Sequence, residues 1–567
     1  MFDTLPHDSA TFITWQWAQI EPFYNELAAR PLNAASVNVW LADWTRLQNL
    51  INEGHARLFV ATTLNTTDQD VESRFHHYLE HIEEPAEMAE QRLREKLLAS
   101  QLEPENFDIA LRDLRTDAAL FREVNIPLFT QEEKLANEFN QVIGAQTVEW
   151  EGEERTIPQM RPLYLHHDRA ERERAWRLAL GRQLADRERL NDLWRQFLAL
   201  RLRIAANADC ATYRDFRWKA MKRFDYTPQD CLDFGDAIEQ VVVPAAERIY
   251  ERRRARLGVE TLRPWDLDVD PFGRPALKPF SAVEDLESKC EAIFKRVDPQ
   301  LGDYFTIMRR EGLLDLDNRK GKAPGGYQID FRTAKRPFIF MNAVGLHDDV
   351  QTLLHEGGHA FHCFESSRLP YAQHLEFGNE IAEVASMSME LLAAPYLSEH
   401  EGGFYSAADA ARARVQHLEN LVLFWPYMAV VDGFQHWAYT HADAAADPKQ
   451  CDAAWGALWD RFMRGVDWSG LDDLRVTGWQ RKVHIFDSPF YYVDYGLAQV
   501  GAVQIWRNAL QDQAAAVQQY RHGLSLGATR SLRELFTAAG GSFATDATTL
   551  GELVALVEET VDGLEMA

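Results

Sequence analysis

A histidine and glutamate motif near residue 355 is the strongest chemical signal in the sequence. The segment DDVQTLLHEGGHAFH contains His355, Glu356 and His359 in the pattern HExxH. Because a helix has 3.6 residues per turn, His355 and His359 share one face and can bind one zinc ion at about 2.0–2.1 Å. Glu356 is turned about 100° from them, so its carboxylate can accept a proton from a zinc-activated water. Roughly 0.05 such matches are expected by chance in a chain of this length, so the pattern favours a metal site.

The residues around this motif predict a buried helix. Its apolar positions are Val350, Leu353, Leu354, Ala360 and Phe361. Buried histidines beside a glutamate need polar partners, and a zinc ion would supply one. The adjacent glycines of the motif, at 357 and 358, each cost about 1 kcal/mol relative to alanine inside a helix. They predict that another backbone or a substrate approaches the helix closely there.

A catalytic zinc ion usually takes three protein ligands, so a third ligand is required. The downstream segment EFGNEIAEVASMSMELL offers four glutamates on a second expected helix: Glu376, Glu380, Glu383 and Glu390. Spacing alone does not choose among them. Glu380 and Glu383 lie one turn apart, so one can bind zinc while the other orients a ligand histidine.

The rest of the chain reads as mainly helical with a few short strands. Apolar residues recur at helical spacing over most of its length. Residues 146–157 alternate and turn at Glu151-Gly152, which predicts a hairpin. Pro244 predicts a kink or a break in the helix expected over 236–257. A loop rich in proline, glycine and aspartate follows at 258–279, and short strands are expected at 325–331 and 337–342.

Composition narrows the class of protein. The formal charge of −27 argues against nucleic acid or an anionic membrane surface as a partner. We expect no signal peptide at the start of the chain and no spanning helix, because no run of about 18 apolar residues occurs. The five cysteines are widely spaced and form no CxxC pair, as is typical of reduced thiols in a cytoplasmic protein.

Taken together, these segments resemble the thimet oligopeptidase and oligoendopeptidase F family of zinc metallopeptidases, especially its bacterial oligoendopeptidase F branch. HEGGHAFH matches the family's HExGH signature, and EVAS, residues 383–386, matches the segment that begins with the family's third zinc ligand. The resemblance therefore implies one zinc ion per chain, held by His355, His359 and Glu383. Glu380 becomes the residue expected to orient a ligand histidine.

The resemblance also implies residues that contact the substrate. HIFDSPFYYVDYGLAQ, residues 484–499, is similar to the family's histidine and tyrosine segment. It implies that His484, Tyr492 and Tyr495 stabilise the oxyanion of the transition state, since imidazole and phenol groups can donate hydrogen bonds to it. Further substrate contacts are expected from Gly325, Gly326, Tyr327, His347 and Tyr491.

The fold implied by the resemblance is a mainly α, two-lobed helical ellipsoid with a deep central channel and a small β-sheet beside the zinc helix. We expect an N-terminal helical region at 1–145 and a catalytic region at 146–567, with a possible lobe boundary near 258–279. The segment PFIFMN, residues 337–342, is expected to present an unpaired strand edge to an extended peptide.

The function implied is zinc-dependent hydrolysis of internal bonds in short unfolded peptides, with Glu356 as general base. Two alternatives stay open. A carboxypeptidase or dipeptidyl carboxypeptidase of the same zinc class would need a cationic group to capture the terminal carboxylate. A non-catalytic peptide-binding protein with a vestigial metal site would bind zinc without turnover.

Overall fold

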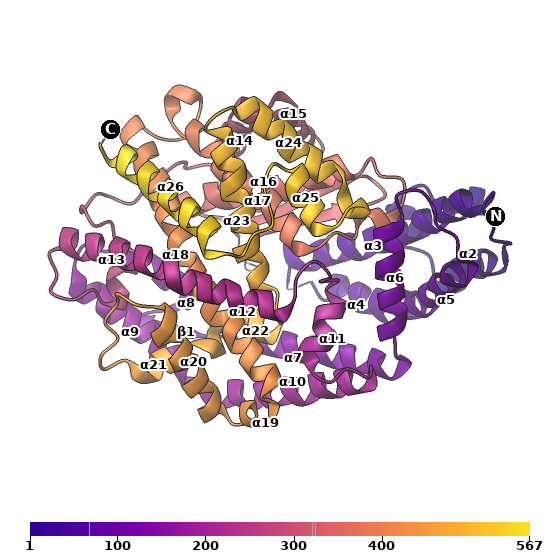
Figure 1. Cartoon of the computed structure of the whole chain (residues 1–567), viewed down its shortest axis with the longest axis horizontal. Coiled ribbons are helices and arrows are strands. Elements are labelled where there is room, and N and C mark those ends of the chain that lie inside the picture. Colours follow the sequence, from indigo (N-terminus) through magenta and orange to yellow (C-terminus); the bar gives the residue numbers. More distant parts are fainter. Residues whose placement is uncertain (67, 320, 324, 567) are drawn as a thin grey trace. The chain divides into compact units, whose positions relative to one another are not determined.

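A computed structural model describes residues 1–66, 68–319, 321–323 and 325–566 (Figure 1). The chain divides into two compact units, each assembled from separate stretches of sequence. Unit 1 comprises residues 1–119, 277–413 and 501–543, and unit 2 comprises residues 120–276, 414–500 and 544–567. One passage between the units falls at 276–277, within the loop expected at 258–279. The sequence-based division at residue 145 stays a prediction.

Unit 1 begins with a helical bundle and continues with the helices that carry the HExxH motif. Its helices are α1 (Ser9–Phe12), α2 (Trp17–Ala29), α3 (Val37–Leu64), α4 (Gln69–Tyr78), α5 (Glu84–Ser100), α6 (Asp108–Leu120), α14 (Val283–Val297), α15 (Pro299–Arg310), α16 (His347–Ser366), α17 (Asn379–Ala393), α24 (Gln513–Ser525) and α25 (Leu532–Ala538). Helices α2, α3 and α5 pack together near the N-terminus, with Trp40 and Trp44 fully buried among them (Figure 1).

A buried carboxylate lies inside this N-terminal bundle. Glu90 of α5 accepts hydrogen bonds from the Tyr24 hydroxyl at 2.6 Å, the Trp44 indole at 2.6 Å and the Gln48 amide at 2.9 Å. Burial raises the pKa of Glu90 to about 7, although the bonds from Tyr24 and Trp44 oppose that shift. The carboxyl group therefore ionises near neutral pH in the folded protein.

A three-stranded sheet lies against the motif helix in unit 1. Its strands are β3 (Leu314–Asp317), β4 (Tyr327–Phe331) and β5 (Arg336–Ala343), in the order β3-β5-β4. Strand β5 is parallel to β3 and antiparallel to β4, and α16 packs on β5 and β4. The two expected strands are confirmed, but the prediction that PFIFMN presents a free edge is wrong. It forms the centre of the sheet because β3, which the sequence analysis did not predict, pairs with its other side.

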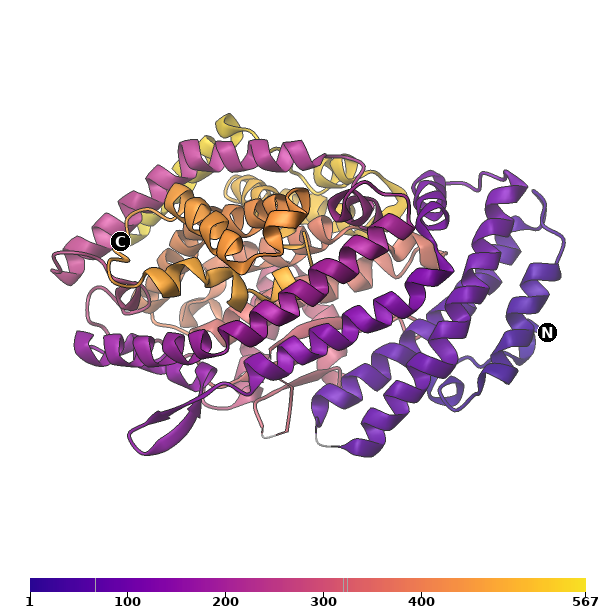
Figure 2. The same ribbon diagram turned by 90° about the horizontal axis from the view of Figure 1, so that it is seen from below.

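Unit 2 is also helical and carries a separate hairpin. Its helices are α7 (Ile126–Gly144), α8 (Ile157–Met160), α9 (Arg169–Ala185), α10 (Arg187–Asn207), α11 (Tyr213–Ala220), α12 (Pro228–Ala237), α13 (Val243–Leu257), most of α18 (Ala407–Thr440), α19 (Ala442–Ala445), α20 (Pro448–Phe462), α21 (Asp472–Val476), α22 (Val483–Phe486), half of α23 (Tyr492–Ala509) and α26 (Ala547–Met566). Strands β1 (Thr147–Trp150) and β2 (Glu153–Thr156) form the predicted hairpin, which projects from the neighbouring helices (Figure 2). Its turn residues Glu151 and Gly152 both have positive φ, as a tight hairpin requires.

The helix expected over 236–257 is irregular at Pro244, as the sequence predicts. Pro244 stands in the first turn of α13, directly after a π-helical turn at Ile238–Val242. The ring removes one backbone donor there, and the chain accommodates this with the π-helical turn while the backbone stays helical on both sides.

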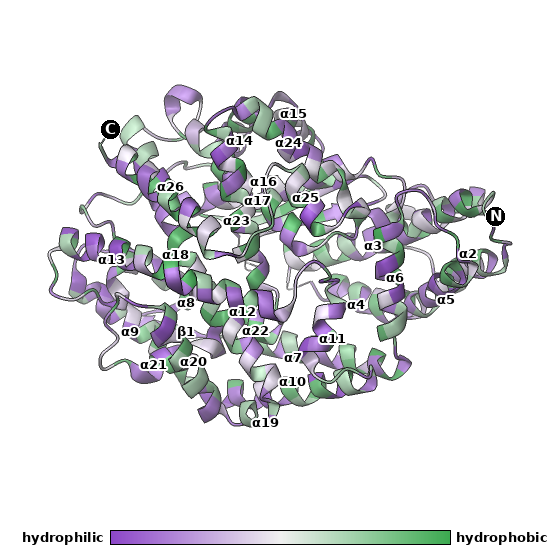
Figure 3. Cartoon of the chain, viewed as in Figure 1, coloured by the Kyte–Doolittle hydropathy of each residue, from purple (hydrophilic) through white to green (hydrophobic). Residues whose placement is uncertain are grey.

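Helices in both units carry hydrophilic and hydrophobic residues side by side (Figure 3). Such mixed helices bury one face and leave the other polar. Among the described residues, no helix has the length and apolar character needed to cross a membrane.

The helices of both units and the three-stranded sheet confirm the predicted mainly α class with a small sheet beside the motif helix.

We predict that Glu90 makes the stability of the protein fall as pH rises toward neutrality. In the folded protein the pKa of Glu90 is about 7, above the usual 4.5. The stability that Glu90 contributes through its raised pKa is therefore complete below about pH 4.5 and is lost as pH rises through 7. Urea unfolding between about pH 5 and pH 8 measures the change, which should reach at most about 3 kcal/mol. Glu90→Gln should remove it.

Glu84→Gln is the matched control, because this exposed glutamate begins the same helix. It should retain the pH dependence of the parent protein. An unchanged pH slope in Glu90→Gln would contradict the assignment.

Candidate metal centre

Helix α16 places the two motif histidines on one face and buries most of its other side chains. His355 and His359 are four residues apart, and their ring centroids are 5.0 Å apart. The apolar positions predicted to be buried, Val350, Leu353, Leu354, Ala360 and Phe361, are all fully buried. The expectation of a buried helix is confirmed.

The two glycines of the motif allow two close contacts. A Cβ on Gly358 would lie 2.4 Å from the Ala385 carbonyl oxygen and 2.5 Å from the Ser386 Cα, both in the backbone of α17. A Cβ on Gly357 would lie 2.6 Å from the Phe294 ring. Gly358 therefore lets α17 approach α16 backbone to backbone, which confirms the close approach predicted from the sequence.

This approach brings Glu383 of α17 to both histidines. Its Oε2 atom lies 3.4 Å from Nε2 of His355 and 3.7 Å from Nε2 of His359. Ligand atoms around a tetrahedral zinc ion with bonds of about 2.0–2.1 Å lie roughly 3.4 Å apart. The three donors are two imidazoles and one carboxylate within 4.8 Å of one another, a set that fits a catalytic zinc ion.

Neighbouring side chains fix the orientation of these donors. Nδ1 of His355 lies 2.7 Å from Oε1 of Glu390, and the Ser386 hydroxyl donates to Oε2 of Glu383 at 2.9 Å. Glu383 and Glu390 are seven residues apart on α17, about two turns, so one helix face holds both nitrogens of the imidazole. The sequence offered Glu390 as a candidate, and this seven-residue spacing was the signal that could have assigned it. The orienting role given to Glu380, a buried residue one turn before Glu383, stays a prediction.

The charges around the histidines favour a cation. Burial disfavours protonation of His355, but the hydrogen-bonding carboxylates of Glu383 and Glu390 outweigh it and raise the pKa of His355 well above its usual range. Burial lowers the pKa of His359 to about 4, so this ring is neutral at physiological pH. Two carboxylates thus stabilise positive charge beside a neutral imidazole, which is the electrostatic setting of a metal ligand set.

Glu356 lies beside this set in a buried environment. Burial raises its pKa to about 7, and the carboxylates of Glu383 and Glu390 contribute to the increase. The backbone N–H of Gln328 in β4 donates to its carboxylate. Because β4 is at the edge of the sheet formed by the described strands, the motif glutamate is linked to an edge strand.

The residues near this sheet that are expected to contact substrate differ in how closely other atoms surround them. Gly325 has φ +94 and nothing within 4 Å of an added Cβ, whereas at Gly326 that Cβ would meet the Phe340 carbonyl oxygen at 3.4 Å. Tyr327 and Thr63 share a hydroxyl hydrogen bond of 2.6 Å. His347, a further residue of this group, is the first residue of α16.

His347 is held by an aromatic neighbour in unit 1. Its Nδ1 atom lies 2.7 Å from the Tyr405 hydroxyl. The ring is largely buried. Its contact with substrate stays a prediction.

The histidine and tyrosines of the 484–499 segment cluster within unit 2. The His484 ring lies 4.9 Å from Tyr492 and 5.9 Å from both Tyr491 and Tyr495, between centroids. Lys482, which the sequence analysis did not single out, has its amine 3.7 Å from the Tyr492 ring centroid. Burial lowers the pKa of Lys482 to about 7.

Buried polar groups anchor this segment. Arg201 of α10 donates to the carbonyl oxygens of Ile485 at 3.1 Å and Phe486. Arg223 donates to the Phe490 carbonyl oxygen at 2.6 Å, and the Gln435 side chain accepts from the Phe490 N–H at 2.6 Å. The histidine and tyrosines are therefore presented by a firmly held backbone.

The helix pair with two histidines, a glutamate between them and a carboxylate from the next helix defines a metallopeptidase. Residues 163–554 match the family model described as Peptidase family M3. This match covers more than half of the chain, so the chain belongs to peptidase family M3.

Curated relatives agree with this family. The chain is 24% identical over 294 residues to a protein of Borreliella burgdorferi named oligoendopeptidase F homolog, a match that covers 51% of this chain and 48% of the relative. It is 22% identical over 306 residues to oligopeptidase PepF of Bacillus subtilis, covering 53% of this chain and 43% of that protein. The chain thus spans about half the length of these relatives.

Solved structures match over nearly the whole chain. A structure titled PZ peptidase A with inhibitor 2 is 25% identical, with a TM-score of 0.89 over 99% of both chains. The oligoendopeptidase-F structure from Enterococcus faecium is 14% identical, with a TM-score of 0.63 over 99% of both chains, and this shows a shared fold. The family resemblance read from the sequence is confirmed.

Gly358→Ala should disrupt the metal centre by forcing α16 and α17 apart. The new Cβ meets backbone atoms, so we expect a loss of about 1–3 kcal/mol in the free energy of unfolding, together with weaker metal binding. Unfolding curves and zinc titration measure the two effects.

Gly181→Ala is the matched control, since Gly181 lies within α9 and an added Cβ has nothing within 4 Å. It should keep or raise stability by about 1 kcal/mol through helix propensity. Equal effects of the two substitutions would refute the helix-contact explanation.

Glu390→Gln should weaken metal binding without removing a ligand. The Nδ1–H group of His355 loses its charged carboxylate acceptor at 2.7 Å. Removing such a partner of a ligand histidine typically costs about 10–100-fold in metal affinity. Competition with a chelating dye measures the affinity. An unchanged affinity would show that Glu390 does not orient the ligand.

Proposed function

We propose that this protein is a zinc-dependent endopeptidase that hydrolyses internal bonds of short unfolded peptides. The observation that carries the proposal is the convergence of His355, His359 and Glu383 beside the buried carboxylate of Glu356. We propose His355, His359 and Glu383 as the ligands of one zinc ion. When bound, zinc polarises the peptide carbonyl and lowers the pKa of a water molecule.

In this proposal Glu356 moves the proton of the reaction. Its carboxylate accepts a proton from the attacking water and later donates it to the leaving amine nitrogen. The pKa of about 7 supports both steps, because the group can gain and lose a proton near neutral pH. The Gln328 N–H holds the carboxylate beside strand β4.

The edge strand β4 supports a binding mode for the peptide. Its free side can add an extended substrate as a further strand, so main-chain hydrogen bonds would bind peptides of varied sequence. Gly325 and Gly326 directly precede β4 and offer little side-chain bulk to an approaching peptide. We propose Tyr327, His347 and Tyr491 as further contacts.

His484, Tyr492 and Tyr495 are proposed to stabilise the oxyanion that forms as the carbonyl is attacked. An imidazole and two phenols can each donate a hydrogen bond to developing negative charge. Their clustering on one anchored segment of unit 2 supports a shared role. The five free cysteines support the cytoplasm as the compartment in which the protein works.

One observation favours a carboxypeptidase as a second candidate. Lys482 is a largely desolvated amine over the Tyr492 ring, and no acidic side chain pairs with it among the described residues. Such a cation can capture a substrate carboxylate. Mapping the products from peptides with free and amidated C-termini separates the two modes, since amidation should abolish only carboxypeptidase cleavage.

We expect the purified protein to cleave a quenched fluorescent peptide of about ten residues at internal bonds. Chelation with o-phenanthroline should abolish cleavage and zinc should restore it. Glu356→Gln should lower kcat by about 10²–10⁴-fold while zinc stays bound, because the proton acceptor is lost.

Glu376→Gln is the matched control, as this exposed glutamate pairs with Arg332 at 2.6 Å. It should leave cleavage unchanged. Absence of cleavage across a varied peptide library, despite bound zinc, would overturn the proposal and favour the peptide-binding alternative.

A further inference from the structure

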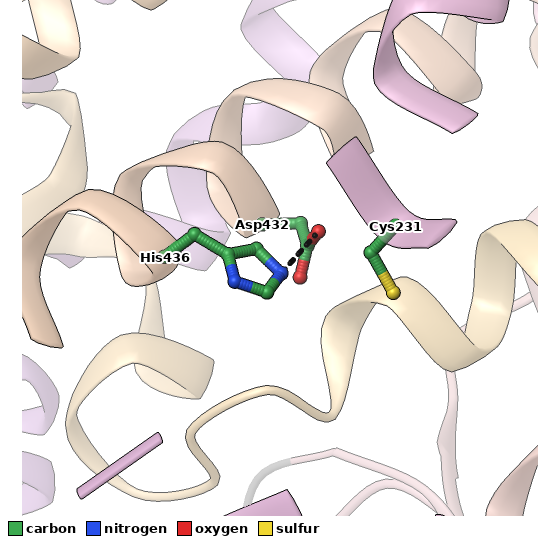
Figure 4. A group of neighbouring side chains, drawn as sticks. All are labelled: Cys231, Asp432 and His436. Carbon is green, nitrogen blue, oxygen red and sulfur yellow. Dashed lines mark ion pairs between the residues drawn. The ribbon is translucent and has the colours of Figure 1, made fainter. Parts of the chain in front are cut away.

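A second group of metal-binding side chains is buried within unit 2. Asp432 and His436 lie one turn apart on one face of α18, and Cys231 faces them from α12 (Figure 4). The Asp432 Oδ2 and His436 Nε2 atoms are 3.3 Å apart. The sulfur, oxygen and nitrogen donors all lie within 4.8 Å of one another.

These donors lack the partners that buried polar atoms normally have. Cys231, Asp432 and His436 are 4%, 4% and 2% exposed. Within the described part of the chain, both ring nitrogens of His436 and the Oδ1 atom of Asp432 have no hydrogen-bond partner. The imidazole is therefore close to the carboxylate without being hydrogen-bonded to it. Unsatisfied buried groups cost about 1–3 kcal/mol each, so a ligand that all three share would remove a substantial penalty.

The surroundings would hold such a ligand firmly. The His436 ring contacts Trp218 and Phe490, with centroids 5.8 and 5.2 Å away. The nearby Arg223 forms an ion pair with Asp494 at 2.5 Å, so these two charges largely compensate each other. A thiolate and a carboxylate would then neutralise a divalent cation with a neutral imidazole as third donor.

We propose that Cys231, Asp432 and His436 form a second metal site, which binds a divalent transition metal ion of the zinc type. Mixed sulfur, nitrogen and oxygen donors suit Zn²⁺, whereas Ca²⁺ and Mg²⁺ take oxygen ligands. Zinc ligands lie roughly 3.3–3.6 Å apart, so the widest pair, at most 4.8 Å apart, has to close by at most about 1.5 Å.

Binding at this site exchanges a proton for the metal. A cysteine binds a metal ion as the thiolate, so the Cys231 thiol has to lose its proton on binding. As the S–metal bond forms, the S–H proton leaves to solvent, and affinity rises with pH. The site ties α12 to α18 and, through Phe490, adjoins the anchored segment that presents Tyr491 and Tyr492. Its role is to brace unit 2.

Cobalt substitution of the full-length protein tests this site. Protein stripped by chelation and reloaded with Co²⁺ should take up two ions per chain and develop a sulfur-to-cobalt charge-transfer band in the near ultraviolet. The proposed peptidase ligands contain no sulfur, so the band does not arise from the peptidase site, and its loss in Cys231→Ser assigns it to Cys231. His359→Ala should retain the band, which makes the result independent of peptidase activity.

Cys231→Ser should lose the band and one metal ion per chain. Cys451→Ser is the matched control, because Cys451 is a buried cysteine of the same unit outside the cluster, and it should keep both. If Cys231→Ser does not fold, the parent protein still decides the question. Absence of the band in the cobalt-loaded parent, or its persistence in Cys231→Ser, overturns the proposal.

Discussion

The backbone contact between α16 and α17 at Gly358 is the constraint on which the metal centre depends. Any side chain there would meet the carbonyl of Ala385 or the Cα of Ser386. Helix–helix contacts through larger side chains keep axes about 8–10 Å apart, and such a separation would move the Glu383 carboxylate, less than one turn from Ser386, away from both histidines. The chain accepts about 1 kcal/mol of lost helix propensity at this glycine. Tyr520 holds the same turn of α17 by donating to the Ala385 carbonyl oxygen at 2.8 Å.

That contact also determines the electrostatics. Once Glu383 and Glu390 face the two nitrogens of His355, three carboxylates, with Glu356, lie beside two imidazoles in a poorly hydrated region. Such an excess of negative charge costs free energy unless protons or a metal cation compensate it. The raised pKa values of His355 and Glu356 mean that these groups hold protons more strongly, and bound protons compensate the negative charge in the absence of a metal ion. A divalent cation does the same with fixed geometry, so metal binding and stability are linked in this helix pair.

Local features were predictable from sequence because they rest on local physics. The spacing of His355 and His359, the turn at Glu151-Gly152 and the irregular helix at Pro244 follow from helix periodicity and backbone freedom. The strand order was not predictable from local pattern, because β3 pairs with β5 and not with β4, the next strand in the sequence, so the strand expected at the edge is central. Partner choice in a sheet is a long-range property.

The two clusters of metal-binding side chains also differ in whether local sequence could predict them. Each has a pair of donors four residues apart on one helix and a third donor on a neighbouring helix. At the HExxH helix the third donor comes from the next helix in sequence, so a search along a short segment could find it. At Asp432 and His436 the third donor, Cys231, lies far away in the sequence, and a DxxxH pair alone is too common to indicate a site. In the second cluster the first donor is followed by Gly433 rather than by a glutamate, and its three residues are nearly inaccessible to solvent. A metal ion held there would have little room for a substrate, so the same ligand arrangement would serve stability rather than catalysis.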